Sequence, residues 1–316
     1  MTNTVRGIIP VMLTAFSDSR SIDWTSQERL TEWYLQQGSE SLFAVCQSSE
    51  MLCLDLSERE ELARFTAQLV NGRVPVIASG HVGATLNEQV NELTKIAATG
   101  IDCLVFVTNR LDPNNLGSEQ LFKTVETLKQ ELPTDIELGL YECPVPYRRL
   151  LSDEEISYFA QDPRFVILKD VSCDLRTVRR RLELTKNSNL VISNANAAIA
   201  FEAMKSGASG FCGVFNNFHP DLYRWLQDEG EIHAELAGEL ARFLVLSAAT
   251  EGMGYPKLAK IYHQRLGTIQ SSFSRAVPEN ILEKYWSLES ILEKIEEGTE
   301  HYRGRIQGLE GARWQS

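Results

Sequence analysis

The stretch Phe165-Val166-Ile167-Leu168-Lys169-Asp170 places a lysine directly after four consecutive apolar residues. Apolar runs that contain β-branched residues are typical of strands buried on both faces, as in parallel sheets. On strand periodicity Ile167 and Lys169 point to one face of the sheet and Asp170 points to the other. We therefore expect a buried parallel strand that ends at Lys169. A lysine there either extends its amine to solvent or lies in a functional site, where loss of hydration turns an amine into a nucleophile.

Similar apolar runs, each followed by a helical pattern, recur along the chain. They predict about eight strands, at residues 7–14, 41–46, 74–78, 103–107, 136–141, 165–170, 190–193 and 210–215. Capping boxes, in which a serine or threonine precedes a glutamate by three residues, predict helix starts near Thr25, Ser57, Thr85 and Ser152. This strict alternation favours a closed (β/α)8 barrel, the TIM barrel, over an open doubly wound sheet.

The strand pattern stops after the barrel, and helical patterns follow at residues 232–250, 255–266 and 278–298. No linker rich in proline, glycine or serine separates the two parts. We expect a catalytic barrel over residues 1–228, a C-terminal helical domain over 229–303 that packs on the barrel or on a neighbouring subunit, and a flexible, glycine-spaced tail over 304–316. The run Arg179-Arg180-Arg181 predicts a solvated helix face.

Composition restricts the partners of this chain. Its 316 residues, 43% of them hydrophobic, suffice for one large barrel, and the net charge of −12 argues against a nucleic-acid or anionic-membrane surface. No apolar run approaches the roughly 20 residues of a membrane span, and the N-terminus lacks the apolar core of a secretory signal, so we expect a cytoplasmic protein. The six cysteines form no CxxC pair and are expected to be reduced, packed thiols.

In a barrel of this kind the active site lies at the carboxyl ends of the strands. Polar residues expected at those ends are Thr14, Gln47, Ser48, Ser49, Glu50, Ser79, His81, Thr108, Asn109, Arg110, Tyr141, Glu142, Lys169, Asp170, Ser193, Asn194, Asn216 and Asn217. They contain no pair of histidine and carboxylate at metal-ligand spacing, so we expect no metal. A lysine that meets a phenol suits Schiff-base chemistry instead, which needs no cofactor beyond the covalent lysine iminium.

The candidate catalytic residues are Lys169, Tyr141 and Ser48. Lys169 would attack a ketone and Tyr141 would relay protons, while Ser48 and the backbone near Ser49 would receive a carboxylate. Each residue also has a structural interpretation: Tyr141 as a buried, hydrogen-bonded phenol, and the two serines as ordinary loop and capping residues. His81 could act as a base, although a histidine at a strand end is more often structural.

These motifs, in order, resemble the dihydrodipicolinate synthase / N-acetylneuraminate lyase family. The resemblance covers residues 7 to about 293 and rests on Gly7-Ile8-Ile9-Pro10-Val11-Met12-Leu13-Thr14, Ser57-Glu58-Arg59-Glu60-Glu61, Val74-Pro75-Val76-Ile77-Ala78, Leu140-Tyr141-Glu142-Cys143-Pro144, Ile167-Leu168-Lys169-Asp170 and the glycines at 207, 210 and 213. It implies a barrel with a C-terminal helical domain, a Schiff base at Lys169, a proton-relaying Tyr141, pyruvate or a related 2-oxo acid as substrate, and a homotetramer built as a dimer of dimers.

The sequence departs from the family pattern near the substrate. Cys46-Gln47-Ser48-Ser49-Glu50 replaces the usual Gly-Ser/Thr-Thr-Gly-Glu turn, and Thr108-Asn109-Arg110-Leu111-Asp112-Pro113 replaces the usual Thr-Pro-Tyr-Tyr run. The arginine expected after the Tyr-x-x-Pro motif is displaced by two positions, to Arg148. The candidate substrate-binding residues, which would set an unusual specificity, are Gln47, Ser49, Arg110, Glu142, Arg148 and Cys212.

The sequence thus predicts a Schiff-base aldolase or lyase that makes or breaks a carbon-carbon bond of a 2-oxo acid. Two alternatives stay open. One is dihydrodipicolinate synthase proper, and the other is a ligand-binding or sensory barrel that has lost turnover.

Overall fold

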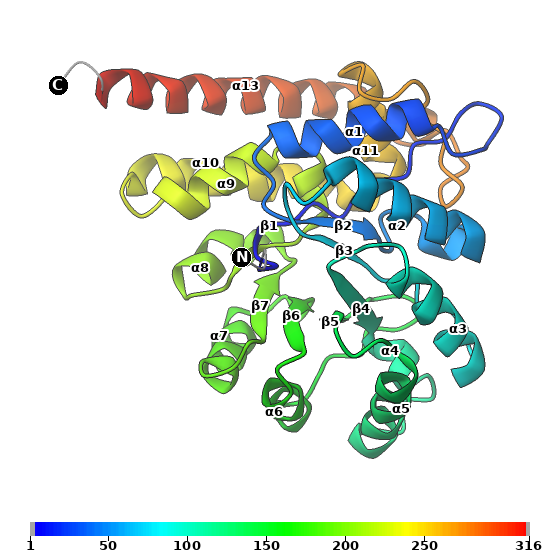
Figure 1. The fold of residues 1–316 in the computed structure, drawn as a ribbon. Helices are drawn as coiled ribbons and strands as arrows, with labels where there is room; N and C mark the ends of the chain where they lie inside the picture. The colour runs from blue at the N-terminus through cyan, green and yellow to red at the C-terminus, as the bar shows by residue number, and fades with distance from the viewer. Residues whose placement is uncertain (1–3, 314–316) are drawn as a thin grey trace.

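Eight parallel strands form one sheet in the order β1-β8-β7-β6-β5-β4-β3-β2, with helices around it (Figure 1). The computed structural model describes residues 4–313, and its strands are β1 Gly7–Ile8, β2 Leu42–Val45, β3 Val76–Ala78, β4 Cys103–Val107, β5 Glu137–Tyr141, β6 Phe165–Asp170, β7 Val191–Asn194 and β8 Gly210–Phe211. The segment that follows β1 closes the barrel against β2, through hydrogen bonds from Met12 N to Phe43 O (3.0 Å) and from Phe43 N to Pro10 O (3.0 Å). The expected (β/α)8 barrel is confirmed.

The first strand is shorter than its apolar run predicts. Pro10 has no amide hydrogen and interrupts the ladder that begins at Gly7, because it cannot donate to a neighbouring strand. Val11 forms only an isolated bridge to Phe43. The chain therefore enters the barrel as a short strand followed by an extended segment.

The barrel helices begin close to the expected positions. They are α1 Trp24–Gln36, α2 Leu56–Val70, α3 Leu86–Ala97, α4 Thr108–Leu111, α5 Ser118–Glu131, α6 Asp153–Gln161, α7 Leu175–Thr185, α8 Ala200–Lys205 and α9 Pro220–Glu229. The capping boxes at Thr85 and Ser152 are confirmed. Those expected at Thr25 and Ser57 are wrong, because Asp23 and Asp55, two residues earlier, accept the cap hydrogen bonds instead.

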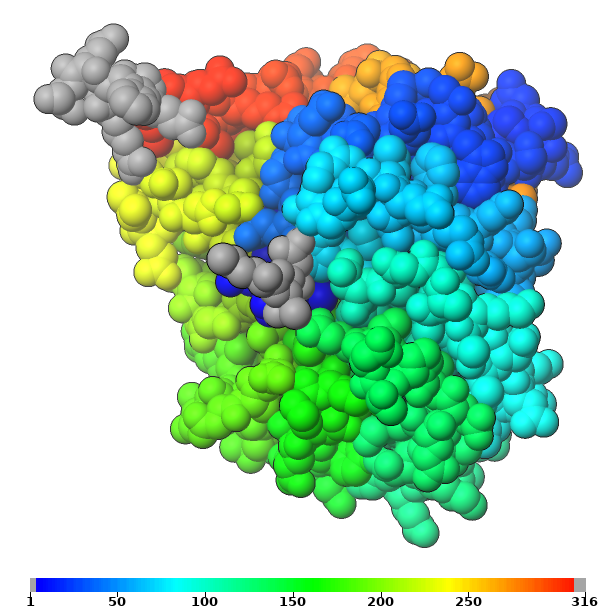
Figure 2. All heavy atoms as spheres, viewed as in Figure 1, coloured from blue at the N-terminus to red at the C-terminus, as the bar shows by residue number. Residues whose placement is uncertain are grey.

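The C-terminal helices α10 Ala234–Ala248, α11 Lys257–Arg265, α12 Ile281–Lys284 and α13 Leu288–Arg313 lie along one side of the barrel (Figure 1). In the space-filling view the C-terminal segments, yellow to red, adjoin the blue N-terminal segments (Figure 2). No helix among residues 4–313 is long and apolar enough to cross a membrane.

The segment predicted as a flexible tail is helical up to Arg313, because α13 continues through it. Tertiary contacts offset the low helix propensity of its glycines. The Arg305 guanidinium forms an ion pair with the Glu239 carboxylate, and Ile306 is buried. The remainder of the predicted tail, residues 314–316, lies outside the described residues.

Candidate active site

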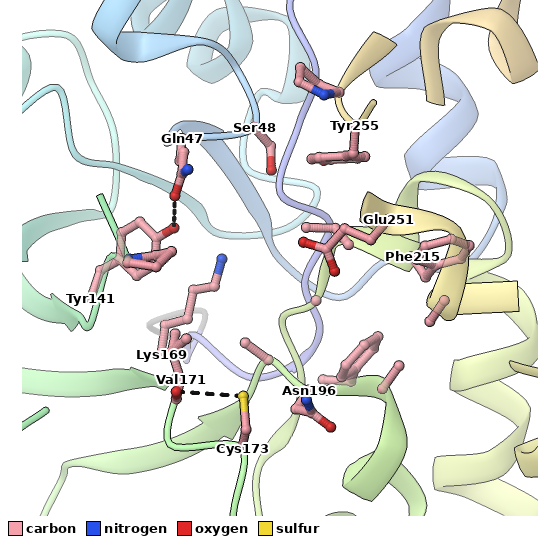
Figure 3. A pocket seen from close by; sticks show the side chains of 18 of the residues that line it. Gln47, Ser48, Tyr141, Lys169, Val171, Cys173, Asn196, Phe215, Glu251 and Tyr255 are labelled. Atoms are coloured by element: carbon pink, nitrogen blue, oxygen red, sulfur yellow. Dashed lines mark hydrogen bonds between the residues drawn. The ribbon is translucent and has the colours of Figure 1, made fainter. Parts of the chain in front are cut away.

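A cavity of about 700 Å³ opens at the carboxyl ends of the strands (Figure 3). Its walls come from the loops after β2, β5, β6, β7 and β8, and from residues 245–256 and 276–277 of the C-terminal part. A volume of this size is typical of small-molecule sites. The strand-end rule therefore locates the cavity correctly for the barrel, while the C-terminal helical part closes it from the other side.

Lys169 lies at the bottom of this cavity. Its side chain is 6% exposed, and its amine points into the cavity (Figure 3). The Lys169 Nζ lies 4.4 Å from the centroid of the Tyr141 ring and 5.7 Å from that of Phe43. Lys169 and Tyr141 are also register partners on β5 and β6. The amine thus meets aromatic faces inside the barrel rather than bulk solvent.

The Tyr141 hydroxyl faces the same cavity. It donates a hydrogen bond of 3.4 Å to Gln47 Oε1, which also accepts one of 3.4 Å from the Cys143 thiol. Burial raises the pKa of Tyr141 well above its ordinary value. The phenol therefore keeps its proton at neutral pH, as a group that donates and relays protons must.

The loop after β2 presents Gln47 and Ser48 to the cavity but turns Ser49 away from it. The Ser49 hydroxyl accepts a hydrogen bond from Cys46 N (2.8 Å) and donates one to Cys46 O (2.7 Å). The Ser48 side chain lies beside Tyr255, and its hydrogen bond to that phenol opposes the rise of the Tyr255 pKa (Figure 3). Ser49 shapes this loop, and Ser48 is the hydroxyl that a ligand can reach.

Glu50 anchors the same loop from behind. Its backbone has a φ of 61°, in the left-handed region, and its buried carboxylate forms an ion pair with Lys260. The carboxylate also accepts hydrogen bonds from Ser274 Oγ (3.0 Å) and Ala276 N (2.7 Å). Glu50 lines the cavity, but its charge is compensated by these partners.

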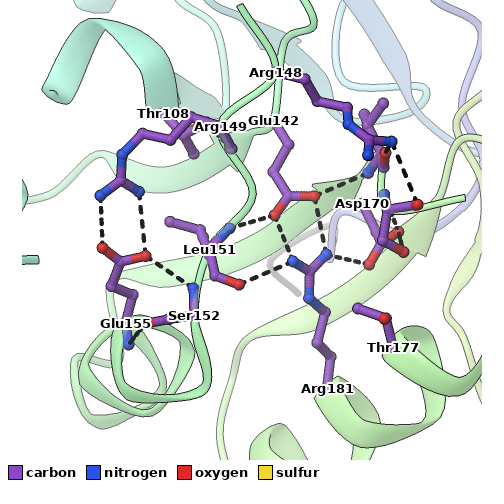
Figure 4. Close-up of polar contacts among 12 residues, drawn as sticks. Thr108, Glu142, Arg148, Arg149, Leu151, Ser152, Glu155, Asp170, Thr177 and Arg181 are labelled. Carbon is purple, nitrogen blue, oxygen red and sulfur yellow. Dashed lines mark hydrogen bonds and ion pairs between the residues drawn. The ribbon is translucent and has the colours of Figure 1, made fainter. Parts of the chain in front are cut away.

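Glu142, which follows Tyr141, belongs to a buried ion cluster behind the catalytic pair (Figure 4). The Arg181 guanidinium donates to Glu142 at 2.6 and 2.9 Å and also pairs with Asp170, the residue after Lys169. Burial raises the pKa of Glu142, and the Arg181 charge opposes that shift. The prediction that Arg181 lies on a solvated face is wrong: its side chain is 2% exposed, because two carboxylates compensate its charge.

Other candidates lie outside the cavity lining. Arg110 is in α4, and its carbonyl accepts a hydrogen bond from Gln89 Nε2 (3.1 Å). Arg148 is exposed, and its Nη1 donates to the Val171 carbonyl at 3.3 Å. Cys212 is fully buried, and burial raises the pKa of its thiol to about 12. The structure therefore brings together Lys169, Tyr141, Ser48 and Gln47, whereas a substrate-binding role of Ser49, Arg110, Glu142, Arg148 or Cys212 stays a prediction.

His81 lies outside the cavity lining and is engaged by neighbouring residues of the fold. Its ring is fully buried, with Nε2 at 2.7 Å from Gln89 Oε1, and its Nδ1 accepts a hydrogen bond from Val107 N (3.2 Å). Burial lowers the pKa of His81 to about 4, so the ring is neutral. Among the described side chains, residues 4–309, no group of three or more histidines, cysteines, aspartates or glutamates is placed to hold a metal ion.

Two cavity residues, Glu251 and Tyr255, were missed by the sequence reasoning. Both lie in the C-terminal helical part, where no strand end marks a site. The Tyr255 hydroxyl accepts a hydrogen bond from Asn217 Nδ2 (2.9 Å), and burial raises its pKa well above the ordinary value. The Glu251 side chain is solvent-accessible within the cavity. Partial burial by the cavity walls raises the pKa of Glu251, and the Lys169 charge opposes that shift. No sequence signal identifies either residue.

A buried lysine beside a protonated tyrosine, at the strand ends of a (β/α)8 barrel, defines the class of lysine Schiff-base (class I) aldolases and lyases. The sequence model of the dihydrodipicolinate synthetase family matches residues 4–294. A 4-hydroxy-tetrahydrodipicolinate synthase from Shewanella baltica (strain OS155) is 28% identical over 253 residues, which are 79% of this chain and 81% of the relative. The chain belongs to the dihydrodipicolinate synthetase family and is an enzyme of the class I aldolase type.

Solved structures show the same fold at lower identity. A dihydrodipicolinate synthase from Bacillus anthracis superposes with a TM-score of 0.81 at 20% identity, over 91% of this chain and 97% of that chain. A prophage protein of the dihydrodipicolinic acid synthase family from E. coli K12, solved with pyruvate, superposes with a TM-score of 0.80 at 19% identity, over 92% of this chain and 99% of that chain.

Proposed function

We propose that this protein uses Lys169 to form an iminium with pyruvate or a related 2-oxo acid, and then makes or breaks the adjacent carbon-carbon bond. The observation that carries the proposal is the buried Lys169 amine, which lies against the Tyr141 ring in a cavity large enough for two small substrates. The structural relative solved with pyruvate supports a 2-oxo acid as the first substrate.

The reaction begins when the unprotonated Lys169 amine attacks the ketone carbon. The ketone oxygen takes up two protons, one from the amine nitrogen and one that Tyr141 relays, and leaves as water, so that a C=N bond replaces the C=O bond. Loss of a proton from the neighbouring carbon gives an enamine. In condensation this carbon attacks an aldehyde, whose oxygen takes up a proton, and water then releases the 4-hydroxy-2-oxo acid from Lys169. Cleavage follows the same steps in reverse.

Tyr141 relays these protons. Its hydroxyl is the phenol in this cavity nearest the lysine strand, and its pKa, raised by burial, keeps the proton available for transfer. Gln47 accepts the hydrogen bond of that hydroxyl and so fixes its direction. Ser48, the loop hydroxyl that lines the cavity, receives the substrate carboxylate.

Borohydride inactivation tests the proposal. Borohydride should inactivate the folded protein in the presence of pyruvate or another 2-oxo acid, because it reduces the iminium to a stable amine. It should not do so without the acid. The matched variant Lys169→Arg keeps the positive charge but cannot form the iminium, so it should acquire no adduct. A folded wild-type protein that forms no adduct with any of a broad panel of 2-oxo acids would contradict the proposal.

Dihydrodipicolinate synthase proper is the second candidate, and the names of the curated relatives favour it. Pyruvate with aspartate semialdehyde tests it directly, since a true synthase consumes both. A ligand-binding barrel without turnover predicts saturable binding, with unchanged affinity in Lys169→Ala. For assembly and location we propose a cytoplasmic homotetramer, on the resemblance to the family, which light scattering and cell fractionation can test.

A further inference from the structure

The cavity continues well beyond Lys169, toward the C-terminal part. Val214, Phe215, Val245, Ala248 and Val277 supply an apolar wall there. A three-carbon 2-oxo acid on Lys169 fills only a small part of the 700 Å³. The remaining space therefore belongs to the second substrate, and an apolar body on that substrate would bury its surface against this wall.

Glu251 is the polar group of this wall. It lies in the short segment Ala249–Met253, and its carboxylate points into the cavity on the side across from Lys169 (Figure 3). Among the side chains that the structure describes, none donates a hydrogen bond to this carboxylate or forms an ion pair with it, and the Lys169 charge only opposes the rise of its pKa. It differs in this respect from Glu50, whose carboxylate is neutralised by Lys260. Glu251 is thus free to accept a hydrogen bond from a ligand.

The cationic side chains on the cavity wall are few. Among the described residues that line it, Lys169 alone carries a positive charge, and the first substrate occupies that residue. The nearby Arg148 guanidinium instead contacts the Val171 carbonyl. A carboxylate on the second substrate would therefore lose its hydration and lie near the Glu251 carboxylate with no cation to compensate its charge. Burial of a charge in this way is unfavourable.

We propose, on the basis of the function proposed above, that the second substrate is an uncharged aldehyde with an apolar body and a hydroxyl group that donates to Glu251. Glu251 then acts as a specificity residue that favours a hydrogen-bond donor and disfavours an anion. In condensation the aldehyde carbon accepts the new bond from the enamine carbon, and the aldehyde oxygen takes the proton that Tyr141 relays. The hydroxyl bound to Glu251 takes no part in bond making.

Three aldehydes that share one ring test this inference: 4-(hydroxymethyl)benzaldehyde, benzaldehyde and 4-formylbenzoate. With pyruvate, the wild-type enzyme should show kcat/KM values that fall in that order, with about tenfold or more between the first and the last. Glu251→Gln keeps the size and an acceptor oxygen but removes the charge, so it should reduce the discrimination against 4-formylbenzoate. Glu251→Lys should reverse it. Ratios between aldehydes within one variant cancel any general loss of activity.

The borohydride adduct with pyruvate, measured for every variant, separates this inference from the proposed function. If the adduct forms but 4-formylbenzoate reacts as fast as the hydroxymethyl compound, the inference is overturned and the function stands. The same holds if the adduct forms and none of the three aldehydes reacts. A preference for 4-formylbenzoate that is lost in Arg148→Ala would show that Arg148 binds an anionic substrate instead. If no adduct forms, both proposals fail.

Discussion

Arg181→Met tests how the ion cluster behind the active site positions the catalytic pair. Arg181 holds Glu142 and Asp170, which directly follow Tyr141 on β5 and Lys169 on β6. The variant keeps most of the apolar length of the side chain but removes its charge. Two carboxylates that are 0% exposed then lose their partner.

The expected loss of stability is large, because breaking a buried pair by removing one partner costs about 3–5 kcal/mol. Glu142 already has a raised pKa from burial, so it can take up a proton in the variant and reduce part of that cost. This protonation gives the prediction a pH signature: the stability difference from wild type should shrink as the pH falls. The free energy of unfolding in urea, measured at several pH values, reports both effects.

The neighbouring residue supplies a matched control. Arg180 lies on the same helix, with its side chain 57% exposed, and pairs with Asp153, whose side chain is 59% exposed. Exposed pairs of this kind contribute under about 1 kcal/mol, so Arg180→Met should hardly change the unfolding curve. Equal unfolding free energies for the two variants would refute the interpretation that Arg181 stabilises the fold by compensating two buried carboxylates.

A positioning role requires a second readout, because loss of stability alone would show only a structural role. Under conditions where Arg181→Met is fully folded, its rate of borohydride-trapped adduct formation should still fall, since a misplacement of about 1 Å can cost about 10²-fold in rate. Arg180→Met should form the adduct at the wild-type rate. A folded Arg181→Met variant with wild-type adduct kinetics would contradict the positioning role.

Three further variants test separate parts of the account. Tyr141→Phe keeps the ring against Lys169 but removes the proton relay, so turnover should fall roughly 10²–10⁴-fold with little change in the unfolding free energy; unchanged turnover would exclude the relay. Gly139→Ala places a Cβ 2.9 Å from Ile167 Cγ2 and should cost about 1–3 kcal/mol by urea unfolding. His219 is buried, and burial lowers its pKa to about 3. Below about pH 6.5 the unfolded chain therefore binds a proton at this histidine that the folded state does not bind. Stability should therefore fall as the pH drops below 6.5, and His219→Phe should make that fall less steep; an identical pH profile for the variant would refute this.

The strand Phe165–Asp170 is predicted to within one residue of its observed end, because contiguous apolar residues mark a strand buried on both faces. Lys169 and Tyr141 follow from the same reasoning, since both end such strands in a barrel whose site lies at the strand ends. Local sequence is sufficient for these features. The prediction needs no knowledge of which residues meet across the fold.

Features that depend on distant partners were missed. In the sequence, Arg181 resembles a surface residue. It is buried in the structure because the carboxylate of Glu142, 39 positions away in sequence, accepts its hydrogen bond and compensates its charge. Glu251 reaches the cavity only because the C-terminal helical part folds over the barrel mouth, and no pattern around it distinguishes it from a surface glutamate. The glycine-spaced end of α13 likewise makes contacts with distant residues, such as that of Arg305 with Glu239.

The site of the borohydride adduct tests the central claim most directly. After reduction with pyruvate, proteolysis and tandem mass spectrometry should place the modification on Lys169 alone. Lys260 is an internal control, because it is also buried but is held in an ion pair with Glu50. A modified Lys169 peptide in the wild type, absent from Lys169→Arg, is the predicted result, whereas an adduct on another lysine or an unmodified folded protein would contradict the account.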